Sequence, residues 1–162
     1  MTSSYFQIVN PQDAIFMSKY PTATAMTTPR NGKLVHLEAG ELVVASNTSF
    51  PIGFLWDNMK LVPSTTANYP LTNSNDLTPM LGLVTGVCRK AITICDGSYF
   101  VAGDTTGDAL ADGDMVACDA GGLIIKAVGN IGAGKYLGRQ TDQYGNKRYM
   151  IAWDFTIATD IA

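Results

Sequence analysis

Short runs of β-branched and aromatic residues, each bounded by turn formers, constrain the fold of this chain more than any other feature. Gly, Asp or Asn stands at many of the boundaries between them. The runs occupy residues 34–40, 41–46, 81–87, 91–97, 98–103, 114–119, 122–128 and 148–155. Extended helical periodicity is hard to find. Closely spaced short strands of this kind predict an all-β protein, either a small β-barrel or a sandwich.

Glycine-containing turns support this prediction. Residues 144–147 (YGNK) suggest a tight hairpin turn centred on Gly145 and Asn146, and residues 119–122 suggest a second turn. Residues 37–45 and 110–118 share a pattern in which Gly and an acid precede an apolar run. In both copies we expect the glycine, Gly40 or Gly113, to supply an unusual backbone angle at the start of a buried strand.

The first 30 residues differ from the rest. They contain three prolines, and their aromatic residues would be poorly placed on a free tail: Tyr5, Phe6, Phe16 and Tyr20. One interpretation is an extended arm, residues 1–30, that docks on another surface or subunit beside a single β domain, residues 31–162. The other is a strand-like cover over the chain's own barrel. The sequence leaves both open.

The composition argues against two classes of partner. Only 15% of the 162 residues are charged, against about 25% in an average soluble domain. The net charge is −3, and no run of Lys or Arg could grip nucleic-acid phosphates. No stretch approaches the roughly 20 apolar residues of a membrane span, and no charged leader is present. We therefore expect neither nucleic acid nor membrane as a partner, and a cytoplasmic protein at synthesis.

Metal binding finds little support. Cys88, Cys95 and Cys118 lack metal-ligand spacing and are expected to be small buried residues on strands. The acidic segment 103–122 does not match a calcium loop, which needs Gly at position 6 and Glu at position 12. Its carboxylates are expected to be turn acids: Asp104, Asp108, Asp112, Asp114 and Asp119. We expect no metal and no cofactor.

Residues 129–136 (GNIGAGKY) have the spacing with which a phosphate-binding loop begins. Tyr136 stands where such a loop needs a small magnesium-binding hydroxyl, and Gly138 and Gly145 argue against a following helix. The segment is therefore expected to be a turn that leads into a strand.

No catalytic constellation is recognisable. His36, the single histidine, lies in a strand-like run, and no GxSxG motif offers an activated serine. Glu38 and Glu41 flank a turn, and the surrounding sequence does not indicate that they act as a catalytic acid and base. Trp56 and Trp153 are expected to be anchors in the core or in an interface. We expect a protein that is not an enzyme.

Two segments carry a resemblance to a known group of proteins. The run 111–124 (ADGDMVACDAGGLI) and the run 132–139 (GAGKYLGR) resemble small decoration, or cement, proteins of tailed-phage capsids. In that group a "GD-apolar-V" strand, a glycine hairpin, a second strand and an "IG...LG" strand recur in a small β-barrel. The resemblance covers roughly residues 34–155.

The resemblance implies a structural virion protein. Such a protein binds the outer surface of a phage capsid and stabilises the shell by bridging neighbouring subunits of the major capsid protein, often as a homotrimer. Its location would be the capsid surface, and the host cytoplasm during assembly. On this interpretation the aromatics of the arm contact the capsid or another subunit: Tyr5, Phe6, Phe16 and Tyr20.

An alternative function remains open at this stage. A receptor- or glycan-binding knob on a phage head or tail would use an exposed aromatic and amide face, formed by Trp56, Tyr69, Asn73 and Asn75. Residues 63–79, which are rich in turn formers, would form a functional or mobile loop.

Overall fold

The computed structural model describes residues 5–23, 26, 29–46, 51–57, 84–101, 109–127 and 133–158. The strands are β1 (Phe6–Ile8), β2 (Ile15–Pro21), β3 (Leu34–Glu38), β4 (Glu41–Val44), β5 (Gly53–Leu55), β6 (Val84–Cys95), β7 (Met115–Asp119), β8 (Leu123–Lys126), β9 (Gly134–Thr141) and β10 (Lys147–Asp154). Short helical turns follow three of them: η2 (Gly97–Tyr99), η3 (Ala120–Gly122) and α2 (Phe155–Ala158).

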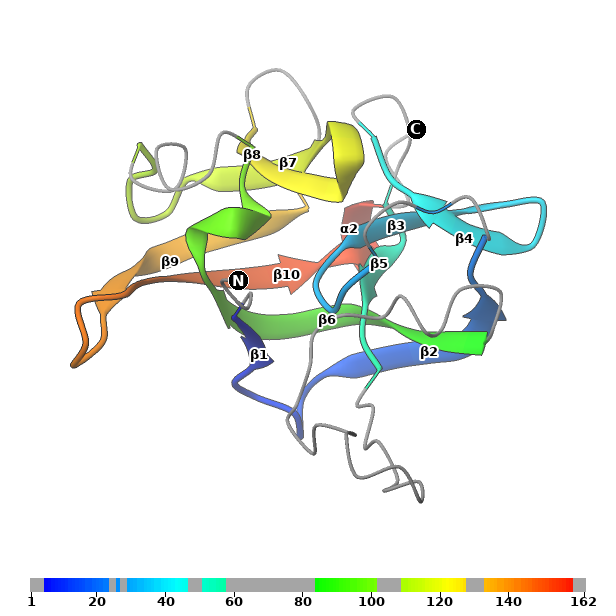
Figure 1. Ribbon diagram of the computed structural model, residues 1–162, viewed down its shortest axis with the longest axis horizontal. Coiled ribbons are helices and arrows are strands. Elements are labelled where there is room, and N and C mark those ends of the chain that lie inside the picture. The colour runs from blue at the N-terminus through cyan, green and yellow to red at the C-terminus, as the bar shows by residue number, and fades with distance from the viewer. Residues whose placement is uncertain are drawn as a thin grey trace, which may run out of the picture.

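The strands form one curled antiparallel sheet that makes a half-barrel (Figure 1). Its main path runs in the order β4-β3-β5-β6-β10-β9-β7-β8. The all-β prediction is confirmed, since the described residues form strands joined by turns and short helical turns.

Strand β6 is the centre of this sheet, and both of its edges are shared between two partners. On one edge β10 pairs with residues 90–95 of β6 and β5 pairs with Val87 and Cys88. On the other edge β1 pairs with residues 93–95 and β2 with residues 84–90. At the division between β10 and β5, Arg89 donates a hydrogen bond to the carbonyl of Phe155 (3.2 Å). The sheet therefore forks at Arg89, and its two halves curl toward each other.

Two expected strand assignments differ from the structure. The runs 81–87 and 91–97 contribute to one long strand, β6, within the described residues. Of the run 98–103, the structure describes residues 98–101, and these are not a strand: Gly97–Tyr99 form the 3-10 turn η2, and Phe100 makes an isolated bridge with Ile124. The cause is Asp96, whose side chain accepts a hydrogen bond from the backbone N–H of Ser98 (3.0 Å) and so favours the turn.

The curl brings the far end of the sheet back against its beginning. The backbone N–H of Gly122, in η3, donates to the carbonyl of Ala45 (2.9 Å). The ammonium group of Lys33 donates to the carbonyl of Gly121 (3.2 Å). A Cβ atom on Gly122 would lie 2.6 Å from the carbonyl oxygen of Leu34, so only glycine allows this approach.

The core fills the inside of the curl. Its larger cluster includes Phe54, Phe100, Tyr149, Trp153 and Phe155, with Trp153 and Phe155 stacked at 5.2 Å between ring centroids. The indole N–H of Trp153 donates to the hydroxyl of buried Thr93 (3.0 Å), which satisfies a polar group that burial would otherwise penalise. Trp153 is thus a core anchor, as its sequence context predicts.

The first segment of the chain belongs to this sheet. Of the two interpretations of residues 1–30, the described residues show strands β1 and β2 paired with the chain's own β6, along the lower edge in Figure 1. Hydrogen-bonded strands bury their backbone polar groups against β6, which an unattached arm would leave to solvent.

The expected turns are present, with one shift. Gly40 and Gly113 have φ of 82° and 92° and precede β4 and β7, so the pattern shared by the two segments does mark left-handed turns. The β9–β10 turn is centred earlier than Gly145-Asn146: the N–H of Gly145 donates to the carbonyl of Asp142 (3.0 Å). Gly145, at φ 84°, follows this turn and closes it in the manner of a three-residue hairpin.

Candidate docking surface

The four aromatics predicted as contact residues do not share one environment. Phe6 is buried, with 3% of its surface exposed, Tyr5 and Tyr20 are half-buried, and Phe16 is 47% exposed. On the sequence alone they form one set of candidate contact residues. The structure places them in different environments at and along β1 and β2.

Phe6 is a core residue of the domain. Its ring lies 5.2 Å from that of Phe54 and 5.1 Å from that of Tyr99. The ring of Trp56 lies 6.0 Å away, and Trp56 itself packs against the same cluster. Phe6 is opposite Cys95 on β6, so this side chain points into the curl of the sheet. In the single chain it has no surface to offer a partner.

Tyr5 is held by three contacts within the chain. Its backbone N–H donates to the carboxylate of Asp96 (2.8 Å), and its hydroxyl donates to the side-chain oxygen of Gln7 (3.1 Å). The guanidinium of Arg148, on β10, lies over its ring at 4.2 Å. These contacts fix the start of β1 against β10.

Phe16 and Tyr20 lie on the same strand in different surroundings. Tyr20 packs against the smaller core cluster, which includes Leu42, Leu55 and Val87. Phe16 follows a register shift between Ile15 and Phe16. A bulge of this kind turns side chains away from the regular alternation of a strand, and here both of these neighbours are exposed.

Phe16 is one of three exposed apolar residues along this edge of β6, which together we call the N-terminal patch: Val9, Ile15 and Phe16. Their exposed fractions are 46%, 44% and 47%. Val9 donates its N–H to the carbonyl of Ile92, Ile15 is opposite Lys90, and Phe16 is opposite Cys88. The three residues therefore follow one another along β6, at alternate positions of that strand.

The N-terminal patch lies on strands that have a partner on one side. Within the described ranges, β1 and β2 pair with β6 and with no second strand, apart from an isolated bridge between Thr22 and Leu42. Sequence reasoning identified Phe16 and missed Val9 and Ile15. Two adjacent apolar residues such as Ile15 and Phe16 are a sequence signal for an exposed apolar side chain, since the alternation of a strand would bury only one of the two.

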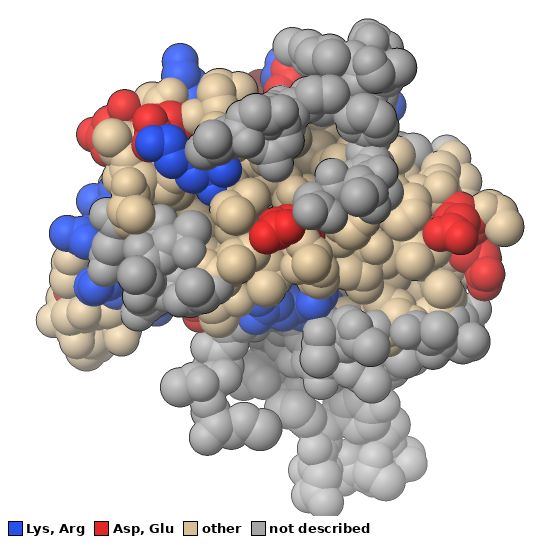
Figure 2. Space-filling model, turned by 90° about the horizontal axis from the view of Figure 1, so that it is seen from above, with Lys and Arg blue, Asp and Glu red and all other residues tan. Residues whose placement is uncertain are grey.

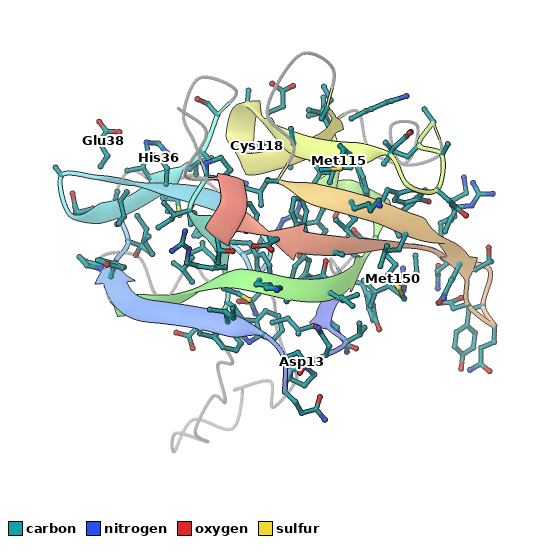
Figure 3. The ribbon with its side chains drawn as sticks, turned by 180° about the vertical axis from the view of Figure 1, so that it is seen from behind. Asp13, His36, Glu38, Met115, Cys118 and Met150 are labelled. Carbon is teal, nitrogen blue, oxygen red and sulfur yellow. The ribbon has the colours of Figure 1, made fainter. Side chains whose placement is uncertain are left out.

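The chain between the two strands is anchored, so the patch has a defined shape. Asn10 accepts a hydrogen bond from the N–H of Ile92 through its side-chain oxygen (2.7 Å), and its carbonyl accepts one from the N–H of Asp13 (3.0 Å). Asp13 lies in this connection, below the sheet in Figure 3. A fixed apolar surface loses little conformational entropy when a partner covers it.

The remaining candidate residues do not form a recognisable catalytic or metal site within the described residues. His36 and Glu38 are neighbours at the outer end of β3 (Figure 3), 3.3 Å apart, and Glu41 is opposite Glu38 across the β3–β4 hairpin. In the described part of the chain, no three His, Cys, Asp or Glu side chains are arranged to hold a metal ion. No described helix has the length and apolarity that a membrane crossing requires.

The motif at residues 129–136 can be followed from Ala133 onward, because residues 128–132 lie outside the described ranges. Gly134–Thr141 form strand β9, so a strand and not a helix follows the glycines, as predicted.

Of the acidic segment, Asp104 and Asp108 lie outside the described residues. Asp114 accepts a hydrogen bond from the N–H of Ala111 (2.9 Å), as a turn acid should. That bond, opposed by partial desolvation and aided by Lys126, lowers the pKa of Asp114.

Burial changes the acidity of four other groups. It raises the pKa of Cys88 to about 11 and that of Cys118 to about 12, and it also raises the pKa of Cys95. All three thiols are free and buried. Burial, followed by the nearby Arg30, lowers the pKa of Lys33 to about 8. Because burial raises the pKa values of the three thiols, none of them is suited to act as a nucleophile at neutral pH.

Comparisons with protein-family models, with curated proteins and with solved structures give no match. The chain's own surface and the resemblance carried by residues 111–124 and 132–139 are therefore what indicates its function. Charged side chains are few and scattered among uncharged ones on the face shown in Figure 2, in keeping with the low charged fraction of 15%. The N-terminal patch is the surface whose chemistry favours burial against a protein partner.

Proposed function

We propose that this chain is a structural virion protein that binds the outer surface of a phage capsid and stabilises the shell by bridging neighbouring capsid subunits. The observation that carries the proposal is the N-terminal patch of Val9, Ile15 and Phe16 on the outer strands of the sheet. Exposed apolar residues beside a one-sided strand suit docking of a partner's extended segment, in which main-chain hydrogen bonds and apolar anchors act together.

The arrangement of the resembling segments supports the proposal. Residues 111–124 form a turn, β7, η3 and β8, and residues 134–139 lie in β9. These strands are adjacent in the order β9-β7-β8. The "GD-apolar-V" strand, glycine turn, second strand and "LG" strand thus form one antiparallel unit.

The energetics suit a cement protein. A protein that binds the assembled shell and not the dissociated subunits stabilises the shell by mass action. Sites repeated across a shell let weak contacts act together when one protein touches two subunits. A modest apolar patch on each copy is then sufficient.

The knob alternative has no structural observation in its favour. Trp56 packs against the core beside Phe6, and Tyr69, Asn73, Asn75 and the loop 63–79 lie outside the described residues. A trimeric assembly and the capsid location remain predictions of the resemblance.

Co-sedimentation with expanded shells of the phage that encodes the chain tests the proposal. We expect the full-length protein to sediment with intact shells and to raise the temperature at which they dissociate. The variant Phe16→Ser should bind at least about tenfold more weakly, because an apolar anchor is removed from the contact. Met115→Ser, which changes an apolar side chain of similar exposure (46%) on β7, is the matched control and should bind as the unmodified protein does.

Two results would contradict the proposal. The first is an absence of co-sedimentation with shells that remain intact. The second is equal binding by Phe16→Ser and the unmodified protein, which would remove the N-terminal patch from the contact. Circular dichroism of each variant checks that the fold is retained.

A further inference from the structure

The β7–β8 hairpin lies at one end of the sheet path, and β8 is the last strand of that path. In Figure 1 the hairpin, drawn in yellow, lies above β9 and β10. Within the described ranges, β8 pairs with β7, and an isolated bridge joins Ile124 to Phe100. In this bridge the N–H of Val101 donates to the carbonyl of Ile124 (2.9 Å). The other attachments of the hairpin lie at its two ends.

The base of the hairpin is attached to β9. Met115 and Val116 are the residues of β7 that pair with β9. The N–H of Tyr136 donates to the carbonyl of Asp114, and the N–H of Ala133 donates to the carbonyl of Val116, both at 2.8 Å. Among the described residues this ladder ends at Val116, whereas β10 is paired with β9 along nearly its whole length. The rest of the hairpin therefore extends past the strand that anchors its base.

The other end of the hairpin, the turn η3, rests on the opposite end of the sheet. The N–H of Gly122 donates to the carbonyl of Ala45 (2.9 Å), and the ammonium group of Lys33 donates to the carbonyl of Gly121 (3.2 Å). We call these two hydrogen bonds the η3 contact. Because water can replace each partner when the turn moves away, hydrogen bonds of this kind contribute only a small net free energy. The η3 contact can therefore open more readily than an apolar contact inside the core.

The fit of η3 depends on one of its two glycines. Gly121 and Gly122 have φ of 77° and 69°, so both lie in the left-handed region. A Cβ atom on Gly122 would lie 2.6 Å from the carbonyl oxygen of Leu34, which is too close for any other residue type. A Cβ atom on Gly121 would have its nearest neighbour, in the side chain of Leu123, at 4.0 Å. The two positions thus share a backbone conformation and differ in their approach to β3.

The inner face of the hairpin covers part of the core. Val116, Cys118 and Ile124 belong to the larger core cluster and are at most 5% exposed. Val116 lies at the base of the hairpin, whereas Cys118, labelled in Figure 3, and Ile124 lie nearer to η3. A hairpin that turned about its base would bring Cys118 and Ile124 into solvent while Val116 stayed beside β9.

We propose that the β7–β8 hairpin is a hinged lid on the core, with its hinge at residues 114–116 and the η3 contact as its latch. The lid moves as a unit, because the ladder from Val116 and Lys126 to Asp119 and Leu123 holds its two strands together. Segments with few attachments to the rest of a domain open at a lower free energy than global unfolding requires. The lid is independent of shell binding, since it concerns the inside of the sheet and not the N-terminal patch.

The variant Gly122→Ala tests the latch. Its added methyl group meets the carbonyl of Leu34 in the closed lid and meets nothing there in the open lid, so the open population should rise at least about tenfold. Gly121→Ala is the matched control. It places the same methyl group at the same kind of backbone angle, but this angle is kept when the hairpin moves as a unit. The control should therefore leave the open population unchanged.

Thiol labelling, located by mass spectrometry of peptides, measures the opening. Cys118 reports on the lid, and Cys88 and Cys95 report on β6. During a brief exposure to the reagent, the unmodified protein and Gly121→Ala should stay unlabelled. In Gly122→Ala we expect Cys118 to react at least about tenfold faster than either cysteine of β6.

Hydrogen exchange of the unmodified protein tests the lid without any substitution. The amides of β7 and β8 should exchange at least about tenfold faster than those shared by β6 and β10. Their exchange should also depend more weakly on urea, because a lid that opens exposes less surface than global unfolding does.

Three results would overturn the proposal. The first is an equal rate of Cys118 labelling in Gly122→Ala and Gly121→Ala. The second is labelling of all three cysteines of Gly122→Ala at one rate, which would indicate global unfolding. The third is equal exchange and equal urea dependence for the hairpin and for β6 in the unmodified protein. A protein that opens in this way without binding shells would leave the lid standing while removing the proposed function.

Discussion

Lys33 is a charged residue with only 6% of its surface exposed, at the point where β3 meets η3. Its ammonium group donates to the carbonyl of Gly121, and burial and Arg30 lower its pKa from 10.5 to about 8. The folded state thus binds this proton less tightly than the unfolded state does. Between pH 8 and 10.5 the unfolded chain holds more protons, so folding becomes more favourable as pH rises through this window.

The variant Lys33→Met should reveal this penalty. We expect its advantage in melting temperature over the unmodified protein to be largest below pH 8 and to shrink as pH rises toward 10.5. Thermal melts across this range measure the difference in melting temperature between the variant and the unmodified protein. Titration of the cysteines does not affect this difference, because both proteins contain the same cysteines. Lys135→Met, at an exposed position of β9, is the control. A Lys33→Met difference that stays constant with pH would contradict the interpretation.

The three cysteines offer a second prediction at this scale. Their thiols are buried, and burial raises their pKa values, to about 11 for Cys88 and about 12 for Cys118. We expect no reaction of the folded protein with a thiol reagent at pH 8 and reaction of all three thiols in denaturant. Rapid labelling of one thiol in the folded protein would show that its strand opens readily.

Among the elements, the β3–β4 hairpin contains a local conflict. Its turn residues, Ala39 and Gly40, have φ of 53° and 82°. Among the described residues, Ala39 alone has a positive φ without being a glycine. A turn with two positive φ angles matches the twist of a hairpin, but a Cβ atom in this region costs energy. The conflict is tolerated because the paired residues of β3 and β4 include buried Val35 and Leu42.

Exchanging the turn residues should change stability in opposite directions. Ala39→Gly is expected to raise the free energy of unfolding by about 0.5–1 kcal/mol, and Gly40→Ala to lower it by about 1 kcal/mol or more. No heavy atom lies within 4 Å of a Cβ atom on Gly40, so the loss would come from the backbone and not from a clash. Urea denaturation measures both changes. If both substitutions changed the free energy of unfolding in the same direction, the result would contradict the turn geometry.

For the whole molecule, the N-terminal strands make up part of the domain. Strands β1 and β2 complete one edge of β6, and Phe6 lies among Phe54, Trp56 and Tyr99. Removing residues 1–30 would open the core as well as remove the N-terminal patch. A truncated chain is therefore a poor test of docking, and point variants such as Phe16→Ser are preferable.

The two phenylalanines of this segment provide the corresponding prediction. Phe6→Ala should lower the free energy of unfolding by about 3–5 kcal/mol, because it leaves a cavity in the core. Phe16→Ala should lower it by less than about 1 kcal/mol, since nearly half of its surface is already exposed. Chemical denaturation measures both. Similar losses for the two variants would mean that β2 packs more tightly than its exposure indicates.

Much of the fold follows from local sequence pattern. The positions of β3, β4, β7, β8 and β10 agree closely with runs of β-forming residues between turn formers. The turns at Gly40 and Gly113 follow from the shared pattern of glycine and acid. Strand propensity and turn chemistry depend on near neighbours, which the sequence displays directly. In contrast, the side chain of Asp96 caps η2 by accepting hydrogen bonds from Ser98, where the residue types alone suggest a strand.

The candidate surface was predictable only in part. The sequence indicated that the aromatics of the first segment matter, and it could not separate Phe6 from Phe16. Pairing with β6 decides this, because Phe6 faces Cys95 inside the curl, whereas a bulge leaves Phe16 outside.

The sequence by itself determined the all-β class, most of the strands and the glycine turns, because these depend on residue types within a few positions of one another. Only the tertiary structure decided that residues 5–23 join the sheet, that β6 forks at Arg89, and which apolar side chains face solvent. Burial is set by partners that are distant along the chain, such as Phe6 and Cys95, and no local pattern specifies which distant strands will meet.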